Sequence, residues 1–561
     1  MTAAEDPNRP EELVFLALGG AGEIGMNLNL YGYAGQWLMI DCGISFGDDT
    51  TPGIEVIMPD PGFIVERRDR LAGIVLTHAH EDHLGAIQYL WPRLKCAVYS
   101  TPFTAAVLRA KLEETNLEGE VPIVEVPMSG KFTVGPFEIE LITLTHSIPE
   151  PNAVVVRTPL GVVLHTGDWK LDPDPLVGPT ADEAALRGLG DGGVLAMICD
   201  STNALRPGES GSEAKVRESL TALVEQCRHR VAVACFATNV ARLTSIASAA
   251  AAHGRHTALV GRSLWRIERA ARETGYLEDV PAFLTDEEGA YLPREKVVFI
   301  CTGSQGEPRS ALARIAEGEH PHVVLEEGDA VIFSSRIIPG NERAIGRLHN
   351  RLASLGVELL TEEDHFVHVS GHPAQDELVR MYQMVRPKVA IPVHGEARHL
   401  RQHLRLAEDC QVPQPILAFN GDMIRLGPLP AAVVGQVATG RLALDGSRLL
   451  SIGSESWKTR RRVAFNGVAV ATVVLGEAGE LLSEPRVSLQ GLGEPDAEFL
   501  VELGGEVAAA VKRLGPRERS SDAAVSEAAR IAVRRAVKTW SAKRPVTEVQ
   551  VVRIGSNGGV R

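Results

Sequence analysis

Short runs of apolar residues, each ended by glycine, aspartate or histidine, dominate residues 13–200. They are rich in valine, isoleucine and leucine, and their length is typical of strands that are buried on both faces. Because loops at one end of the strands of an α/β sheet meet in a common crevice, the polar residues that end these runs are expected to lie together. The runs are LVFLALGG (13–20), WLMIDCG (37–43), GIVLTHAH (73–80), IELITLTH (139–146), GVVLHTGD (161–168), VLAMICD (194–200) and, far downstream, KVAIPVHG (388–395).

Between about residues 208 and 370 the pattern changes to strands that are each followed by a helix. The first such pair is VAVACF with NVARLTSIASAAAAHG, the second is TALVG with LWRIERAARETG, and the third is KVVFICT with PRSALARIAEG. This alternation indicates an α/β domain with a parallel sheet of its own. Since the first pattern resumes afterwards, we predict that this domain is inserted into the other one.

The remainder of the chain indicates a linker and a small α+β domain. GSESWKTRRR is rich in glycine and serine and then basic, which is typical of a linker. Beyond it a strand pair, two helices near 495–514 and 521–540, and a last strand are predicted, with Ser521 as the N-cap of the second helix. The predicted boundaries are 1–207 and 371–445 for the split domain, 208–370 for the insertion, 446–462 for the linker and 463–561 for the terminal domain.

Length and composition restrict the classes of protein. A chain of 561 residues is too long for one hydrophobic core, and 44% hydrophobic with 23% charged residues is ordinary for a globular protein. The net charge of -15 argues against a surface that binds nucleic acid everywhere, although a basic cleft remains compatible with it. Seven cysteines without paired spacing indicate reduced thiols and a cytoplasmic protein. The polar start MTAAEDPNRPEE is unlike a signal peptide, and no apolar run is long enough for a membrane span.

The stretch GAGEIG (20–25) matches the glycine pattern of dinucleotide-binding loops. That function requires a helix directly after the glycines, whereas MNLNLYGY and WLMIDCG continue as strands. We therefore reject a nicotinamide or flavin site and expect these glycines to form a tight turn beside the crevice.

The stretch LTHAHEDHLGA (76–86) is the most informative one in the chain. His78, His80, Asp82 and His83 place three imidazoles and a carboxylate within six positions after a buried strand. This ligand set suits zinc or a similar ion. A histidine-rich surface loop is the alternative, and the preceding buried strand makes it the weaker interpretation.

The order of these motifs resembles a known superfamily. H-x-H-x-D-H after an apolar strand, followed by His146, Asp168 and His394, resembles the metallo-β-lactamase superfamily. The insertion, CDSTN with Asp200, HVSGHP with His372, and PVHGE resemble its β-CASP nucleases. LGGAGEIGMN, CFATN, CTGSQGEP and SSRIIPGNE make the chain similar to the ribonuclease J family in particular. The resemblance covers essentially the whole chain and implies an αββα sandwich with an inserted β-CASP domain and a C-terminal α+β domain.

The resemblance also implies the roles of single residues in a two-metal site. It implies two zinc ions, with manganese as the alternative, and it makes Asp82, Asp168 and His372 catalytic. A site of this kind activates water for phosphodiester hydrolysis. The implied ligands are His78, His80 and His146 for one ion, Asp82, His83 and His394 for the other, and Asp168 as the bridge.

Two further motifs indicate a site for phosphate. HVSGH, which is His368, Val369, Ser370, Gly371 and His372, places imidazole, hydroxyl and backbone donors at the start of a helix. His372 can bind a phosphate oxygen or protonate the leaving 3′-oxygen, and a structural helix cap is the alternative. His368 is ambiguous in the same way.

CFATN repeats this geometry, so Phe236, Ala237 and Thr238 are candidates for the same ligand. Family members usually have serine where Thr238 stands, and the hydroxyl group is kept. Ser335 and Arg336 in FSSRIIPG are weaker candidates, because a single arginine is more often a solvated surface residue.

Several other polar residues have a structural interpretation beside a functional one. Asp200 is expected to orient a metal-bound histidine, although an aspartate at a strand end can simply cap a turn. His165 lies within an apolar run and is expected to be a core histidine. A structural calcium ion could be bound by three aspartates in loops, Asp48, Asp49 and Asp445. A basic run could contact RNA, namely Lys458, Arg460, Arg461 and Arg462. For both sets the alternative is that the side chains are simply solvated.

These observations favour a metal-dependent ribonuclease that degrades RNA from the 5′ end, prefers a 5′-monophosphate, also cuts internally and acts in RNA maturation and decay. The alternatives are a hydrolase of a small ester, lactone or thioester, a DNA-directed β-CASP nuclease, and an inactive scaffold of an RNA-processing assembly. The insertion argues against the first and the complete ligand set against the last. The terminal domain is expected to drive self-association, and the sequence leaves dimer and tetramer open.

Overall fold

The computed structural model describes residues 11–48 and 50–555, and the chain divides into two compact units. The larger unit comprises residues 1–46 and 56–441, and the smaller comprises 47–55 and 442–561. Each unit has its own hydrophobic core. The segment MTAAEDPNRP and Asp49, which the sequence analysis used, lie outside the described residues.

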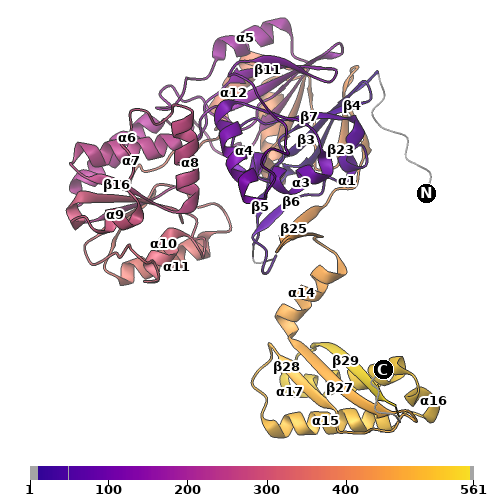
Figure 1. Cartoon of the computed structure of the whole chain (residues 1–561). Coiled ribbons are helices and arrows are strands. Elements are labelled where there is room, and N and C mark those ends of the chain that lie inside the picture. Colours follow the sequence, from indigo (N-terminus) through magenta and orange to yellow (C-terminus); the bar gives the residue numbers. More distant parts are fainter. Residues whose placement is uncertain (1–10, 49, 556–561) are drawn as a thin grey trace. The chain divides into compact units, whose positions relative to one another are not determined.

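Two β-sheets packed face to face form the centre of the larger unit (Figure 1). The first has the strand order β24 (Ala432–Gln436), β23 (Asp422–Gly427), β1 (Leu13–Gly19), β3 (Leu28–Tyr33), β4 (Gln36–Ile40), β7 (Leu71–Val75), β8 (Val98–Ser100) and β9 (Ile123–Glu125). The second has the order β10 (Lys131–Val134), β11 (Phe137–Thr143), β12 (Asn152–Thr158), β13 (Gly161–His165), β14 (Ala196–Asp200), β20 (Val389–Val393) and β22 (Gln414–Pro415).

The second sheet is covered on both faces, which explains its nearly continuous apolar strands. Along β12, Val154 and Val156 belong to the core between the sheets, whereas Ala153 and Val155 belong to a core on the outer face. Helices α5 (Glu183–Gly192), α12 (Gln375–Val385) and α13 (Ala397–Asp409) supply that outer core. In the first half of the sandwich, α2 (Glu81–Leu84) and α4 (Pro102–Glu114) follow strands β7 and β8 of the first sheet, α3 (Ile87–Leu94) comes directly after α2, and α1 (Gly62–Val65) precedes β7. The predicted αββα sandwich is thereby confirmed.

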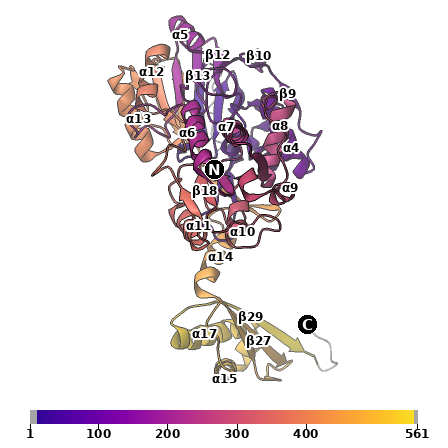
Figure 2. The ribbon, with the colours of Figure 1, turned by 90° about the vertical axis from the view of Figure 1, so that its left-hand side faces the viewer.

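The insertion leaves and rejoins the sandwich at two neighbouring strands. β14 and β20 pair in parallel, with Ala196 beside Val389 and Asp200 beside Val393, so the chain leaves β14 at one end of the sheet and, after the insertion and α12, enters β20 at the other end. The inserted domain has a parallel sheet in the order β16 (His256–Val260), β17 (Val297–Cys301), β15 (Val231–Ala234), β18 (Ala330–Phe333) and β19 (Glu358–Leu360). Its helices (Figure 2) are α6 (Glu213–Gln226), α7 (Val240–Ala252), α8 (Arg262–Glu273), α9 (Asp286–Ala290), α10 (Ala311–Ala316) and α11 (Glu342–Ser354).

A buried ion pair connects the insertion to the segment that returns from it. Arg242 on α7 and Glu213 on α6 are each 1% exposed and lie 3.1 Å apart. Arg242 also donates to the carbonyl oxygens of Ser334 (2.8 Å) and Val367 (3.0 Å). Val367 directly precedes the HVSGH motif, so this guanidinium fixes the backbone that enters the motif.

The smaller unit contains the predicted α+β domain. Its sheet has the order β28 (Arg486–Gln490), β27 (Val468–Gly476) and β29 (Val546–Ile554). Helices α15 (Ala497–Lys512) and α17 (Asp522–Ser541) pack on one face of this sheet, and the short helix α16 (Pro516–Arg519) lies between them in sequence. The Ser521 side chain accepts a hydrogen bond from the amide of Ala524, which confirms the predicted N-cap.

The stretch that the sequence indicated as a linker is regular secondary structure. It contains β26 (Arg448–Ser451) and most of α14 (Glu455–Asn466), a helix that the sequence analysis missed. Ser454 caps this helix through the amide of Trp457, and Glu455 pairs with Lys458 at 3.0 Å. Composition alone did not reveal that the charges of this run have partners one helical turn away.

No helix among the described residues has the length and apolarity needed to cross a membrane. All seven cysteines are free thiols, and six of them are buried.

The Arg242–Glu213 pair yields a prediction about stability. Arg242→Ala leaves Glu213 buried without its counter-ion, so we expect the free energy of unfolding to fall by about 3–5 kcal/mol. Urea denaturation followed by circular dichroism measures this change. Lys215→Ala, at an exposed position of α6, the helix that carries Glu213, is the matched control. Equal midpoints for the two variants would contradict the prediction.

Candidate metal centre

Seven histidine and aspartate side chains gather where strands of both sheets end. Five of them lie in loops that follow a strand and two lie on the helix that comes next, and all seven were predicted from the sequence as ligands. His78 and His80 follow β7, and the helix α2 that comes next carries Asp82 and His83. His146 follows β11, Asp168 follows β13 and His394 follows β20. The structure therefore brings together residues that are far apart in the chain.

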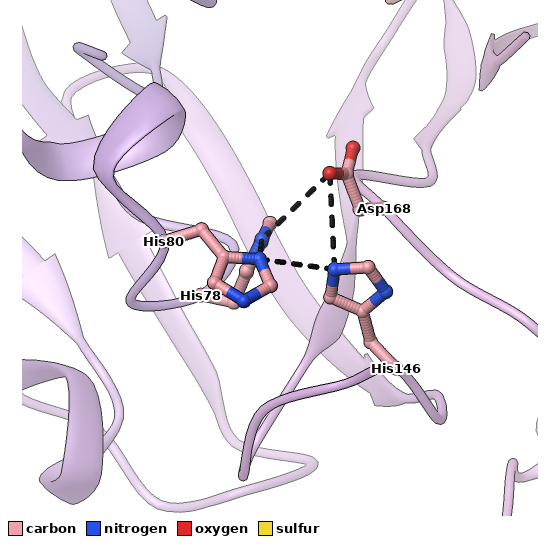
Figure 3. Close-up of side chains that lie close together, drawn as sticks. All are labelled: His78, His80, His146 and Asp168. Atoms are coloured by element: carbon pink, nitrogen blue, oxygen red, sulfur yellow. Dashed lines mark hydrogen bonds and ion pairs between the residues drawn. The ribbon is translucent and has the colours of Figure 1, made fainter. Parts of the chain in front are cut away.

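The first group consists of His78, His80, His146 and Asp168 (Figure 3). The Nδ1 atom of His80 lies 3.0 Å from Nε2 of His78 and 3.0 Å from Nε2 of His146. The Oδ2 atom of Asp168 lies 3.9 Å from each of these two Nε2 atoms.

The second group consists of Asp82, His83, His394 and again Asp168. Oδ2 of Asp82 lies 3.1 Å from Nε2 of His394, and Oδ2 of Asp168 lies 3.1 Å from Nε2 of His83. Asp168 is 3% exposed and is the one residue common to both groups.

The contacts within these groups fit metal ions. An imidazole nitrogen has one hydrogen or one lone pair, so Nδ1 of His80 cannot form good hydrogen bonds to two other ring nitrogens at once. Oδ1 of Asp168 is buried and has no hydrogen bond of good geometry, although it lies 3.0 Å from Nδ1 of His394. Lone pairs that converge in this way suit a cation, and imidazole with carboxylate suits zinc or manganese.

The protonation of three of the histidines is consistent with a role as ligands, whereas the surrounding carboxylates favour the protonated form of His83 and His394. Burial lowers the pKa of His78 and His146 well below the usual value, and it lowers the pKa of His80 to about 4. Neutral imidazole is the form that binds metal. Burial opposes the charge of His394 too, but the carboxylates around it, Asp168 first, outweigh burial and raise its pKa.

Side chains around the two groups hold the histidines in place. Oδ2 of Asp41 lies 2.7 Å from Nδ1 of His83, and its Oδ1 accepts a hydrogen bond from the amide of Thr77 at 2.9 Å. Nδ1 of His146 lies 2.5 Å from the carbonyl oxygen of Gly371. Such partners fix the orientation and tautomer of a ligating histidine.

Sequence reasoning missed the part that Asp41 plays. The residue ends the strand run WLMIDCG, so it carried the same signal as the other aspartates at strand ends. Its φ of +63° is in the left-handed region, which is unfavourable for aspartate and typical of constrained positions at functional sites.

His372 and Asp200 form a pair beside the two groups. Nδ1 of His372 lies 2.8 Å from Oδ2 of Asp200 and 3.8 Å from Oδ2 of Asp168. Burial would lower the pKa of His372, but the carboxylate of Asp200 and then that of Asp168 outweigh burial and raise it. Oδ1 of Asp200 lies 3.5 Å from Nδ1 of His394. Asp200, which the sequence indicated as a partner of a metal-bound histidine, thus has His372 as its hydrogen-bonded partner.

The HVSGH motif lies against the first group. A Cβ atom at Gly371 would come within 2.6 Å of Cε1 of His146, so only glycine allows the loop to approach this closely. Val369 is buried, and His368 is nearly so, with no hydrogen-bond partner for its Nδ1. Burial and then the nearby guanidinium of Arg242 lower the pKa of His368, which keeps this imidazole neutral.

The CFATN motif is connected to HVSGH through the same arginine. Phe236, Ala237 and Thr238 are half-buried in the loop between β15 and α7. Asn239 caps α7 by accepting a hydrogen bond from the amide of Arg242, whose guanidinium holds Val367. Both predicted phosphate loops therefore depend on one buried side chain.

The weaker candidates have protein partners. Ser335 donates to the carbonyl oxygen of Ser304 at 3.4 Å, and Nε of Arg336 lies 3.2 Å from Glu362. His165 is buried, and its Nδ1 lies 2.9 Å from the hydroxyl of Tyr31, as expected for a core histidine.

The carboxylates suggested for calcium also have partners. Asp48 accepts a hydrogen bond from the amide of Thr50 at 2.8 Å, and Asp445 pairs with Arg460 at 2.6 Å. Within 11–48 and 50–555, neither belongs to a group of three potential ligands. Arg462 pairs with Glu455, so the basic run of α14 is partly neutralised.

The GAGEIG segment lies beside the centre as a two-residue strand between bends, and strand β3 rather than a helix follows it. β2 (Ala21–Gly22) pairs with β21 (Gly395–Glu396), and the amide of His394 donates to the carbonyl oxygen of Gly20. The φ of Gly20, +87°, requires the freedom of glycine.

Four family models match successive parts of the chain. They are the metallo-beta-lactamase superfamily (residues 27–224), the ribonuclease J beta-CASP domain (228–352), the Zn-dependent metallo-hydrolase RNA specificity domain (357–413) and the ribonuclease J C-terminal domain (457–554).

Full-length relatives agree with these models. The chain is 44% identical to ribonuclease J of Sinorhizobium meliloti over 98% of this chain and 99% of that one. It is 38% identical to ribonuclease J of Mycolicibacterium smegmatis over 96% of each chain, and 37% identical to ribonuclease J of Thermus thermophilus over 83% of each. Among solved structures, a protein of unknown function from Enterococcus faecalis V583 has a TM-score of 0.52 at 16% identity, covering 74% of this chain and all of that one, and supports the fold alone.

The contact between Asp41 and His83 yields a prediction about metal affinity. We expect Asp41→Ala to weaken binding of zinc or manganese about 10- to 100-fold, because His83 loses the carboxylate that orients it. Asp82→Ala, which removes a candidate ligand, should lose one ion outright and abolish hydrolysis. Elemental analysis and titration with metal after dialysis against a chelator measure both effects.

Asp69→Ala, an exposed aspartate of the same sandwich, is the control and should keep about two ions per chain. Normal metal content and affinity in Asp41→Ala would refute the role of Asp41, and a single ion in the unaltered protein would refute the two-group interpretation.

Proposed function

Since this chain belongs to the ribonuclease J family of metal-dependent ribonucleases, we propose that it removes nucleotides from the 5′ end of RNA, prefers a 5′-monophosphate and also cuts internally. We further propose that it acts in the cytoplasm in RNA maturation and decay. The observation that carries the proposal is the position of HVSGH: this donor-rich loop directly contacts the histidines and aspartates of the metal centre.

The residues that would hold two ions are those of the two groups, with Asp168 common to both. When bound, ions of this kind supply Lewis-acid chemistry, which makes water a nucleophile at neutral pH and offsets charge on phosphoryl oxygens. His78, His80, His146, Asp82, His83, Asp168 and His394 contribute by holding their nitrogen and oxygen atoms toward common points within a buried site. Because all seven are present and converge, an inactive scaffold is disfavoured.

His372 is placed to protonate the leaving 3′-oxygen. Asp200 occupies its Nδ1, and within the described residues its Nε2 has no hydrogen-bond partner. The side chain keeps 21% of its surface exposed, so the ring is partly open to solvent. Asp200 fixes the ring and stabilises its protonated form, which is what a general acid requires.

The phosphate loops account for the preference at the 5′ end. Ser370 and the backbone donors of HVSGH lie next to the metal centre, and the CFATN loop is held by the same arginine. A terminal monophosphate, with its extra charge, suits such donors. A 5′-hydroxyl leaves them unpaired, and a 5′-triphosphate is too bulky for a closed pocket.

Labelled RNAs that differ only at the 5′ end test the proposal. We expect 5′-monophosphorylated RNA to be degraded fastest, with mononucleotide products. An unpaired buried donor costs about 1–3 kcal/mol, which corresponds to roughly tenfold or more in rate. Ser370→Ala and His372→Ala should reduce the preference, and His372→Ala should also lower the rate of hydrolysis.

Ser354→Ala, an exposed serine at the end of α11, is the matched control and should behave as the unaltered chain. Equal rates for monophosphate and triphosphate ends, or products released from the 3′ end, would refute the pocket. Internal cutting of structured RNA, which needs no terminal phosphate, should be less affected by Ser370→Ala.

We also propose that the C-terminal sheet mediates self-association. α15 and α17 cover one face of the sheet, and the other carries the outward residues of β27, among them Val470, which alternate with buried alanines and valines. Among the described residues no further strand pairs with β28 or β29 at the edges of this sheet, and such a sheet with valines on its open face suits a second copy of the chain.

Removal of residues 454–561 should therefore lower the oligomeric state, dimer or tetramer, and lower activity without abolishing it. Sedimentation velocity measures the change. Val470→Lys in the full chain should act in the same direction, whereas Val501→Lys, 67% exposed on α15, should not. An unchanged oligomer after truncation would contradict the proposal.

A further inference from the structure

Asn203 reaches from the loop after β14 to the HVSGH motif. Its Nδ2 atom lies 2.7 Å from Oγ of Ser370 and 2.9 Å from the carbonyl oxygen of His372. The side chain is 7% exposed, so water does not compete freely for these contacts. In the motif CDSTN only Asp200 was predicted to have a role, and Asn203 was not.

The chemistry of the two partners determines how the amide is oriented. A carbonyl oxygen only accepts hydrogen bonds, so the group of Asn203 that faces His372 must be its NH₂. The same nitrogen has a second hydrogen, which is directed at Oγ of Ser370. Asn203 is thus a donor in both contacts.

Ser370 receives a further hydrogen bond from the backbone. The amide of His372 donates to Oγ of Ser370 at 3.2 Å. A hydroxyl oxygen has two lone pairs and one hydrogen. Since both lone pairs are used, only the hydrogen of Ser370 is left, and within 11–48 and 50–555 no acceptor contacts it.

We propose that Asn203 is a positioning residue that makes Ser370 an obligate hydrogen-bond donor to a phosphate oxygen of RNA. The inference rests on the proposed function, in which Ser370 belongs to the pocket for the 5′-phosphate. A serine that is free to rotate can present a lone pair to an anion, which is repulsive. With both lone pairs occupied, the hydroxyl can only be attractive to an anion.

Residues on either side of Asn203 in the chain also form hydrogen bonds to the HVSGH motif and to the helix that follows it. Asp200 holds His372, and the carbonyl oxygens of Ala204 and Arg206 accept hydrogen bonds from the side chain and the amide of Gln375, at the first turn of α12. Residues 200–206 therefore position both the proposed general acid and the proposed phosphate donor, and they do so from the end of β14 and the loop that leads into the insertion.

Only an amide satisfies this geometry. Aspartate at position 203 has no hydrogen for the carbonyl of His372, and it would attract the hydrogen of Ser370 to itself. It would also add a negative charge next to the phosphate. Alanine would remove both hydrogen bonds and leave the hydroxyl free to rotate, with no added charge.

The test is the ratio of initial rates on 5′-monophosphate and 5′-hydroxyl RNA, measured with metal-loaded full-length protein. We expect Asn203→Asp to lower this ratio about tenfold, as much as Ser370→Ala, and Asn203→Ala to lower it less. Asn203→Ala combined with Ser370→Ala should lower it no further than Ser370→Ala alone, because both act through one hydroxyl. Asn350→Asp, the same change at an exposed site on α11, should leave the ratio unchanged.

Each outcome separates the alternatives. A ratio that stays high in Asn203→Asp, or independent losses in the double variant, overturns the role of Asn203 while the proposed function stands. Equal losses on both RNAs with a lower unfolding midpoint or metal content show a merely structural residue and also overturn it. If the unaltered protein does not discriminate between the two ends, the proposed function fails, and the inference fails with it.

Discussion

One buried carboxylate, that of Asp168, connects every part of the centre. Its oxygens lie between 3.0 and 3.9 Å from nitrogens of five histidines, and its pKa is lowered although burial alone would raise it. Such a density of imidazole and carboxylate groups would be costly in the interior of a protein without a cation. The strands of both sheets end here, so the sandwich supplies a rigid frame that holds these groups together in spite of their mutual repulsion.

The insertion is coupled to this centre through its points of departure and return. Because β14 and β20 are neighbours, the loops that follow them bring Asp200 and His394 to the same end of the sheet. The return segment then carries HVSGH past Arg242, a residue of the insertion, and into contact with His146. The insertion, the HVSGH motif and the metal centre are therefore joined by hydrogen bonds rather than lying in independent domains.

The sequence predicted most of the strands and all seven candidate ligands, because buried strands are continuous apolar runs and ligands follow them directly. It did not reveal the contact of Asp41 with His83, since that contact requires β4 to lie beside β7 in the sheet. Nor did it reveal Asn203, whose partners lie beyond the whole insertion. α14 was missed for another reason: the basic run that indicated a linker is stabilised by Glu455 one turn away. Local composition indicates which secondary structure a segment favours, whereas these features depend on which segments become neighbours in the fold.

The position of His394 in the chain has a consequence for biosynthesis. Six of the candidate ligands are translated before the insertion, and His394 is translated after it, directly after strand β20, which lies between β14 and β22. A nascent chain emerging from the ribosome therefore holds an incomplete centre and an open second sheet until the insertion has been made. Because His394 lies about 70% of the way along the 561-residue chain, the full set of candidate ligands exists only after roughly the length of three average domains has been synthesised.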